Sequence, residues 1–103
     1  MTMNVETKFS EDNQVLTISI SGSFDFNSLN VFRQAYSDDA IKSAKVIVDM
    51  RNTTTIDSSA LGMLLNMQRY LKRADGEISI INCNPIVAKI FAITHFSKKF
   101  NIS

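Results

Sequence analysis

The sequence predicts a single α/β domain, residues 1–103, in which an N-terminal β-hairpin is followed by alternating strands and helices. Two strand-like segments separated by a polar turn open the chain. Beyond them, apolar runs of strand length alternate with segments whose apolar residues recur at helical spacing. Such strands pair in parallel through crossover helices, so we expect a mixed, mostly parallel sheet packed with helices in the order ββαβαβαβ. How the three helices divide between the two faces depends on strand order, which the pattern leaves open.

The hairpin is predicted by alternation of apolar and polar residues on both sides of a turn. Residues 3–9 alternate weakly, whereas Val15–Ser21 alternates cleanly, as a half-buried strand does. Glu11–Gln14 between them contains Asp and Asn, which favour turn geometry. We expect Gly22 to end the second strand.

The first helix and the central strand come next. Apolar residues at helical spacing predict a helix to about Asp38, with Asn27 or Ser28 as its cap. Lys45–Met50 is β-branched and almost continuously apolar, which predicts a strand covered on both faces. We expect Arg51–Ile56 to form a loop after this strand.

Two further helices and two strands complete the pattern. Ser58 to about Ala74 is expected to be a helix, because a leucine stripe runs along it and Gly76 follows as a left-handed cap. Glu77–Cys83 then predicts a second buried strand. An Asn-Pro pair opens a helix expected over residues 84–94, and residues 100–103 are expected to form a final short strand.

Composition sets limits on the class of protein. The chain has 45% hydrophobic and 20% charged residues, as soluble globular domains do, and a net charge of +1, so no overall field favours direct binding to nucleic acid. No apolar run approaches the roughly 20 residues that span a bilayer, so we expect no membrane insertion. The N-terminal residues lack a signal-peptide pattern. The single Cys83 cannot form an internal disulfide. We therefore expect a cytoplasmic protein with a buried, unreactive thiol.

The pair Asp57-Ser58 is the strongest candidate for function. It follows the central strand and precedes a helix, so the Ser58 hydroxyl is expected to be reachable there. The alternative is an ordinary helix cap, which stabilises a helix by about 1 kcal/mol. Asp25 has the same ambiguity, because it either caps the first helix or lies beside Ser58. The carboxyl ends of parallel strands meet at one edge of a sheet, which makes the second arrangement possible.

Self-contained catalysis is not expected. A nucleophilic Ser58 needs a base, and the sole histidine, His95, lies far along the chain. The sequence around Ser58 is not a Gly-x-Ser-x-Gly elbow. His95 and Cys83 do not have the spacing of metal ligands, and the three glycines are too isolated to form a phosphate loop. We therefore expect no enzyme activity, no metal and no cofactor.

At this point the sequence resembles a known family. The stretch Ile56–Gly62, with Val48–Met50 and Gly22–Asp25 before it and Asn82–Pro85 after it, is similar to the STAS domain of sulfate transporters and anti-sigma-factor antagonists. The resemblance covers essentially the whole chain, and the length is similar to that of the free-standing antagonists. Two departures stand out. Ala60 replaces the family's usual glycine, and His95 occupies a place where the family often has glycine, so we expect the final turn to differ.

The resemblance implies a role for each residue of the motif. Ser58 would be phosphorylated by a partner serine kinase of anti-sigma type. The partner-facing surface would comprise Asp25, Asp57, Ser59, Leu61 and Gly62. The unphosphorylated protein would bind the kinase in a partner-switching pathway that regulates transcription. Phosphorylation would release it, and a PP2C-like phosphatase would reset it.

Two other functions remain open at this stage. The chain could be a STAS subunit bound to the ATPase of a lipid-type ABC transporter, in which case Ser58 would only cap a helix. A nucleotide-binding module is the third possibility, although no phosphate loop supports it. Neighbouring genes would discriminate, because a kinase and a phosphatase favour the switch and transporter subunits favour the alternative.

Overall fold

The computed structural model describes residues 4–12, 14–37 and 43–103. Its helices and strands follow the predicted order. They are β1 (Val5–Phe9), β2 (Val15–Phe24), α1 (Leu29–Tyr36), β3 (Lys45–Ile56), α2 (Ser58–Tyr70), β4 (Ser79–Ile81), α3 (Pro85–Ile93) and β5 (Asn101–Ile102). Short 3-10 turns precede α1, at Phe26–Ser28, and follow α3, at Phe96–Lys98.

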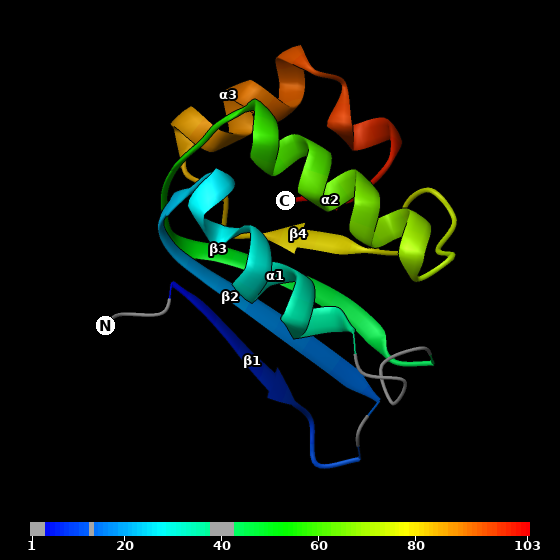
Figure 1. Ribbon diagram of the computed structural model, residues 1–103. Coiled ribbons are helices and arrows are strands. Elements are labelled where there is room, and N and C mark those ends of the chain that lie inside the picture. Colours follow the sequence, from blue (N-terminus) through cyan, green and yellow to red (C-terminus); the bar gives the residue numbers. More distant parts are fainter. Residues whose placement is uncertain (1–3, 13, 38–42) are drawn as a thin grey trace.

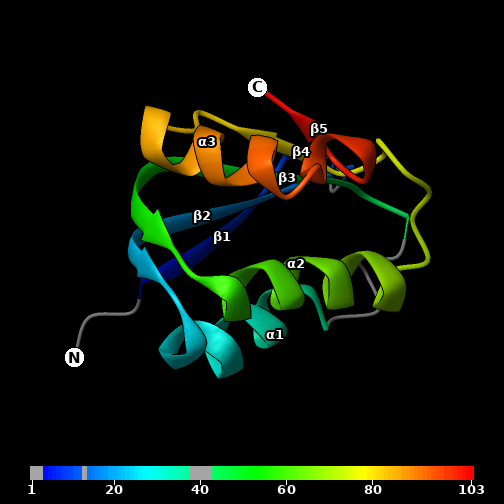
Figure 2. The same cartoon turned by 90° about the horizontal axis from the view of Figure 1, so that it is seen from above.

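Within the described residues, the strands form one sheet in sequence order, β1-β2-β3-β4-β5; Figure 1 shows β1 to β4, and Figure 2 also shows β5. β1 is antiparallel to β2, and the other pairs are parallel, so the predicted mixed, mostly parallel sheet is confirmed. Each crossover moves one strand in the same direction, and right-handed crossovers therefore place all three helices on one face. α1 and α2 lie side by side, while α3 lies apart from them near β4 and β5 (Figure 2).

The core lies between the sheet and these helices. Alternate residues of the strands are buried on the helix-covered face: Leu16, Ile18, Ile20, Val46, Val48, Met50 and Ile80. Residues of the opposite parity, such as Ile47 and Asp49, are only partly buried. The prediction that the central strand is covered on both faces is therefore wrong. The prediction failed because Ile47, which lies on the helix-free face of the sheet, is apolar and makes the run look continuously buried.

β3 extends six residues further than predicted, so the expected loop at residues 51–56 is wrong. This extension pairs with the end of β2, which runs through Gly22 to Phe24. Ser19 pairs with Asp49, and Phe24 pairs with Ile56. Between these two pairs β3 advances by seven residues and β2 by only five, because the register shifts at two places. Bulges of this kind break the alternation that identifies a strand in a sequence. Gly22 has φ of +72° and lies beside one shift instead of ending the strand.

One helix and one strand are shorter than predicted. α2 ends at Tyr70, because Lys72 takes a left-handed conformation (φ +54°) before Gly76 is reached. β4 is limited to three residues because its neighbour β5 has only two and Asn82 (φ +61°) leaves the strand. The predicted end of the first helix, Asp38, lies outside the described residues.

Candidate functional site

The ends of β2 and β3 meet at one edge of the sheet. Phe24 and Ile56 are register partners, and the backbone N–H of Asp57 donates to the Phe24 carbonyl at 3.4 Å. Asp25 and Asp57 each follow one of these paired residues. Since adjacent strands lie about 4.8 Å apart, the two aspartates are neighbours at this edge. The structure thus brings together two candidate residues that are 32 positions apart in the sequence.

Asp57 is the N-cap of α2. Its Oδ1 accepts the backbone N–H of Ala60 at 3.0 Å and the hydroxyl of Ser59 at 2.6 Å. The Ser59 hydroxyl, helped by backbone N–H groups of the first turn, lowers the pKa of Asp57 from its ordinary value. Asp57 is therefore a charged carboxylate throughout the neutral pH range, and the hydroxyl of Ser59 is already engaged.

Ser58 is the first residue of α2 and is exposed. In contrast to Ser59, its side chain makes no hydrogen bond with any residue that the structure describes. A hydroxyl at this position faces solvent beside the positive end of the helix dipole. It is thus the more accessible of the two serine hydroxyls for a reaction.

The other candidates contribute differently. Asp25 caps the 3-10 turn before α1, since its Oδ1 accepts the N–H of Asn27 at 2.9 Å. It is therefore both a cap and a neighbour of Asp57. Gly62 lies on the exposed side of α2. Apart from its chain neighbours and the backbone of its own helix, no atom of the described residues lies within 4 Å of the place where a Cβ would stand. Leu61 is partly buried against the core, so only part of its side chain can face a partner.

Two residues that support the site were not recognised from the sequence. Thr53 is buried, and its hydroxyl donates to the Ile20 carbonyl at 2.7 Å, beside the first register shift. Asn84 was predicted only as a helix cap. Its Oδ1 does accept the N–H of Val87 at 2.8 Å, and its Nδ2 also donates to the carbonyls of Thr53 and Thr54 at 2.9 and 3.2 Å. These bonds join the start of α3 to the end of β3.

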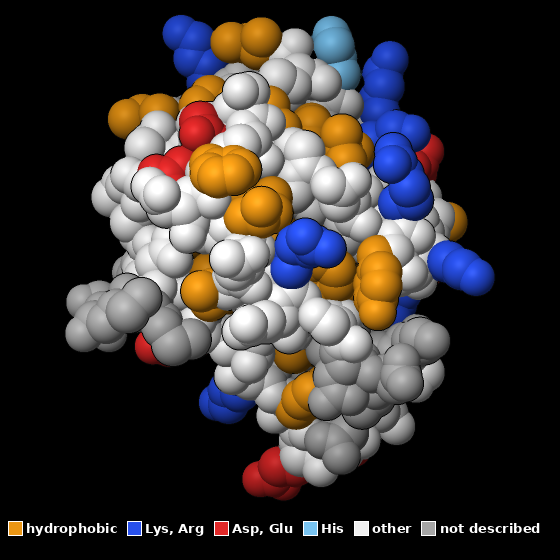
Figure 3. Space-filling model, in the orientation of Figure 1, with side chains coloured by type: hydrophobic (Ala, Val, Ile, Leu, Met, Phe, Trp, Pro, Cys, Tyr) orange, Lys and Arg blue, Asp and Glu red, His pale blue; other side chains and the backbone are white. Residues whose placement is uncertain are grey.

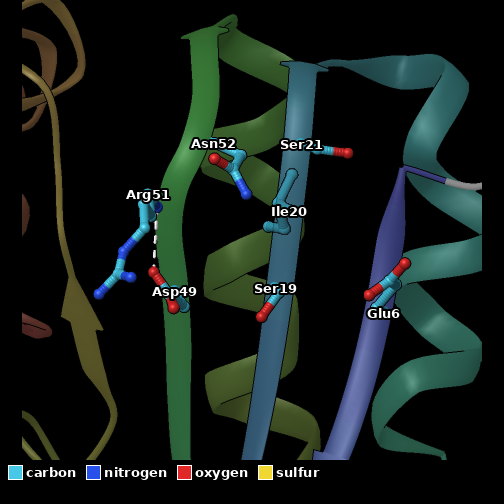
Figure 4. A pocket seen from close by; sticks show the side chains of 7 residues that line it. All are labelled: Glu6, Ser19, Ile20, Ser21, Asp49, Arg51 and Asn52. Atoms are coloured by element: carbon cyan, nitrogen blue, oxygen red, sulfur yellow. Dashed lines mark hydrogen bonds between the residues drawn. The ribbon is translucent and has the colours of Figure 1, made fainter.

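A separate hollow lies on the helix-free face of the sheet (Figure 4). It has a volume of about 310 Å³ and is lined mainly by polar side chains of the first three strands. α1 and α2 lie behind the strands in this view. The Asp49 carboxylate there accepts hydrogen bonds from the Arg51 backbone and the Asn82 amide, both at 3.0 Å. The Oδ1 atom of Asp49 is thus already engaged within the fold.

Cys83 is half-buried, and burial raises the pKa of its thiol. Within the described ranges, no three His, Cys, Asp or Glu side chains are grouped so that they could hold a metal ion. None of the helices described is both long and apolar enough to cross a lipid bilayer.

Comparison with known proteins identifies the family. The sequence model of the STAS domain family matches residues 4–103 of this chain. This chain belongs to the STAS domain family. A STAS-domain-containing protein of Pseudomonas aeruginosa is 48% identical over 94 residues, which cover 91% of this chain and 93% of that protein. The anti-sigma-B factor antagonist of Bacillus subtilis is 24% identical, over 100% of this chain and 93% of that protein.

Solved structures share the STAS fold. The anti-sigma factor antagonist SpoIIAA in its unphosphorylated form superposes with a TM-score of 0.66 and 16% identity, over 93% of this chain and 86% of that chain. The Bacillus cell fate determinant SpoIIAA in its phosphorylated form gives a TM-score of 0.66 and 17% identity, over 96% of this chain and 90% of that chain. The STAS fold predicted for this chain is therefore confirmed, and its resemblance to anti-sigma-factor antagonists extends to curated relatives.

Proposed function

We propose that this STAS chain is a phospho-switched antagonist that binds an anti-sigma-type serine kinase while Ser58 is unphosphorylated. One observation carries the proposal. Of the two serines at the start of α2, Ser58 has an exposed hydroxyl without a bonding partner among the described residues, whereas Ser59 bonds to Asp57. A kinase needs a hydroxyl that is free to attack the phosphate of ATP.

The electrostatics of the site support a switch that leaves the fold intact. Phosphorylation adds about −1.5 to −2 charges at neutral pH. The N-terminus of a helix tolerates this charge, because its N–H groups and dipole favour anions. The carboxylates of Asp57 and Asp25 lie nearby, so the added phosphate creates a dense negative surface. A partner surface that fits the uncharged serine is repelled by that surface.

The comparisons support the class of partner. The Bacillus subtilis relative is named an anti-sigma-B factor antagonist, and SpoIIAA has been solved in phosphorylated and unphosphorylated forms. By analogy, the partner of this chain is an anti-sigma-type kinase, and a PP2C-like phosphatase removes the phosphate in the cytoplasm. The chain itself is substrate and binder, with no catalytic role.

Phosphorylation in vitro tests the proposal. The unmodified chain is incubated with ATP and a serine kinase of anti-sigma type encoded next to its own gene, and the product is mapped by mass spectrometry. We expect a single phosphate on Ser58. A phosphate on Ser59 or Thr54 would contradict the assignment of the acceptor. Absence of phosphorylation, together with neighbouring genes for transporter subunits, would favour the ABC-transporter role.

A further inference from the structure

A groove runs between α1 and α2 on the helix-covered side of the molecule. It has a volume of about 570 Å³ and is lined by Leu29, Arg33, Tyr36, Ser37, Met63, Asn66 and Tyr70. Figure 3 shows this face, with apolar atoms separated by basic side chains over the two helices. Leu29, Tyr36 and Met63 are partly or fully buried in its walls, whereas Asn66 and Tyr70 are exposed at its rim.

The groove is continuous with the Ser58 site. α1 and α2 both begin at the edge where Asp25 and Asp57 are neighbours, and they lie side by side from there (Figure 1). On α2, residues 58, 62, 66 and 70 follow one another at steps of four, and all are exposed. Residues four apart share a helix face, so these positions form one strip about 18 Å long. A protein that covers Ser58 and lies along this strip also reaches the groove.

Exposed aromatic residues mark both ends of this surface. Phe26, directly after Asp25, is 69% exposed, and Tyr70, at the end of α2, is 53% exposed. Tyr70 is held in place by edge-to-face contact with Tyr36, at 5.6 Å between ring centroids. Large aromatic side chains that remain exposed on a small domain are typical anchors of protein interfaces.

One residue without a side chain lies on α2 between Ser58 and Tyr70. Gly62 is exposed in the middle of a helix, where glycine costs up to about 1 kcal/mol relative to alanine. Packing within the described residues does not require a glycine here, because no neighbouring element approaches the place of the missing side chain. A helix surface without a side chain allows another backbone to approach closely. The position therefore fits a partner element lying across α2.

The charge of the groove indicates the chemistry of its occupant. Arg33 is exposed and is the only charged residue among those described as lining the groove. Its guanidinium binds carboxylates through paired hydrogen bonds. The apolar walls and this cation together fit an amphipathic segment that carries an acidic residue.

We propose that the kinase-type partner extends from Ser58 into this groove with an amphipathic helix, whose apolar side chains face Leu29 and Met63 and whose carboxylate pairs with Arg33. The inference rests on the proposed function and adds to it a second part of the interface. The groove supplies affinity that phosphorylation does not alter directly, while Ser58 supplies the switch.

Two charge substitutions of equal size test the groove. Asn66→Glu places a carboxylate in the groove beside Arg33, where it competes for the guanidinium and repels the partner's carboxylate, whereas Gln34→Glu places the same charge at an exposed position of α1 outside the lining. Both variants are titrated against the serine kinase that phosphorylates Ser58. ADP replaces ATP in this titration, so that no phosphate is transferred to Ser58. Circular dichroism checks that both variants are folded. We expect Asn66→Glu to weaken binding at least tenfold and Gln34→Glu to change it less than twofold. Phe26→Ser, a second variant at the other end, is expected to weaken binding without affecting the core.

Parallel measurement of Ser58→Asp separates the two proposals. If Ser58→Asp loses binding while Asn66→Glu and Phe26→Ser bind like the unmodified chain, the groove inference is wrong and the switch stands. If Ser58→Asp also binds normally, or no kinase phosphorylates Ser58, the proposed function fails and the groove inference fails with it. A dimer of this chain that Asn66→Glu dissociates in sedimentation would assign the groove to a second copy and overturn the inference.

Discussion

At the scale of single residues, the start of α2 separates two roles that a sequence cannot separate. Asp57 carries the capping interactions, through Ala60 and Ser59. Ser58 carries none of them, although it is the next residue. A residue that takes no part in these capping hydrogen bonds can accept a phosphate, or lose its hydroxyl, with little effect on the free energy of unfolding. The fold and the proposed switch are therefore independent at this point.

Substitution of Ser58 is expected to give two folded proteins with opposite behaviour. Ser58→Ala removes a hydroxyl that is not a cap, so the free energy of unfolding should change by less than about 0.5 kcal/mol. It should resist phosphorylation and stay bound to the kinase in the presence of ATP. Ser58→Asp suits the helix N-terminus, yet its charge beside Asp57 should weaken binding at least tenfold, because an unpaired charge in an interface costs several kcal/mol. Thermal melts and kinase titrations distinguish these outcomes. Equal binding by both variants would contradict the charge switch.

Gly62→Ala is expected to raise stability and lower partner binding. Alanine is the better helix former by about 0.5–1 kcal/mol, and the space around the new methyl group is empty. The same methyl group would hold a partner backbone away from α2. Chemical denaturation should show a higher free energy of unfolding, and titration with the kinase a weaker affinity. A variant that is more stable and binds as well as the unmodified chain would remove Gly62 from the interface.

At the scale of elements, the bulged end of β3 determines where the site lies. The register shifts leave Ile20 without a register partner in β3, and the Thr53 hydroxyl bonds to its carbonyl instead. Hydrogen bonds from the Asn84 side chain then join the start of α3 to the same segment of β3. A polar, threonine-rich stretch looks like a loop in the sequence because these bonds join residues that are some 30 positions apart.

Thr53→Val is expected to destabilise the fold by about 1–3 kcal/mol. Valine has nearly the same shape, but it leaves the buried carbonyl of Ile20 without this hydrogen bond. The matched control is Thr55→Val in the same strand, where the side chain is exposed and the expected change is within about 0.5 kcal/mol. Urea unfolding of both variants measures the difference. Equal stabilities would show that Thr53 has no structural role.

The N-terminus of α2 should give a defined pH dependence. The pKa of Asp57 is lowered in the folded protein, mainly by the Ser59 hydroxyl. A lowered folded-state pKa contributes stability above the unfolded value, about 3.9, and this contribution is lost as pH falls through the folded value. Asn at position 57 still caps but does not titrate. The stability gap between the unmodified chain and Asp57→Asn should therefore narrow from pH 6 to pH 3.

Because Asp57 is exposed, this gap should stay below about 1 kcal/mol. Ser59→Ala is the control, since removing the hydroxyl returns the pKa of Asp57 towards its ordinary value and should reduce the pH dependence. A gap that does not vary with pH would mean that the Asp57 carboxylate gains nothing from its partners.

At the scale of the whole molecule, the order of elements was predictable and the coverage of the sheet was not. Alternation in Val15–Ser21 and helical spacing after Ser58 are local signals, and both were interpreted correctly. The placement of all helices on one face follows from strand order, a long-range property. The apolar Ile47 therefore suggested a second covered face that does not exist.

For the candidate site too, the individual residues were predictable from the sequence and their arrangement in space was not. The sequence identified Asp25 and Asp57 individually, because cap residues after strands have a local pattern. Their proximity depends on the pairing of Phe24 with Ile56, which only the assembled sheet provides. The groove between α1 and α2 depends on how two separate helices pack, and Thr53 on a bond across strands. Neither has a local signature.

The two bulges of β3 also have a consequence for how relatives of this chain should be compared. β3 uses seven residue steps to cover the distance that β2 covers in five, so the chain length between Asp49 and Ile56 sets the level at which Asp57 emerges. One residue more or fewer would shift that level by about 3.3 Å, out of line with Asp25. Sequences that retain this pair of aspartates should therefore conserve the spacing even where the residues themselves vary. In an alignment, a gap within this segment would be a stronger sign of altered signalling than a substitution.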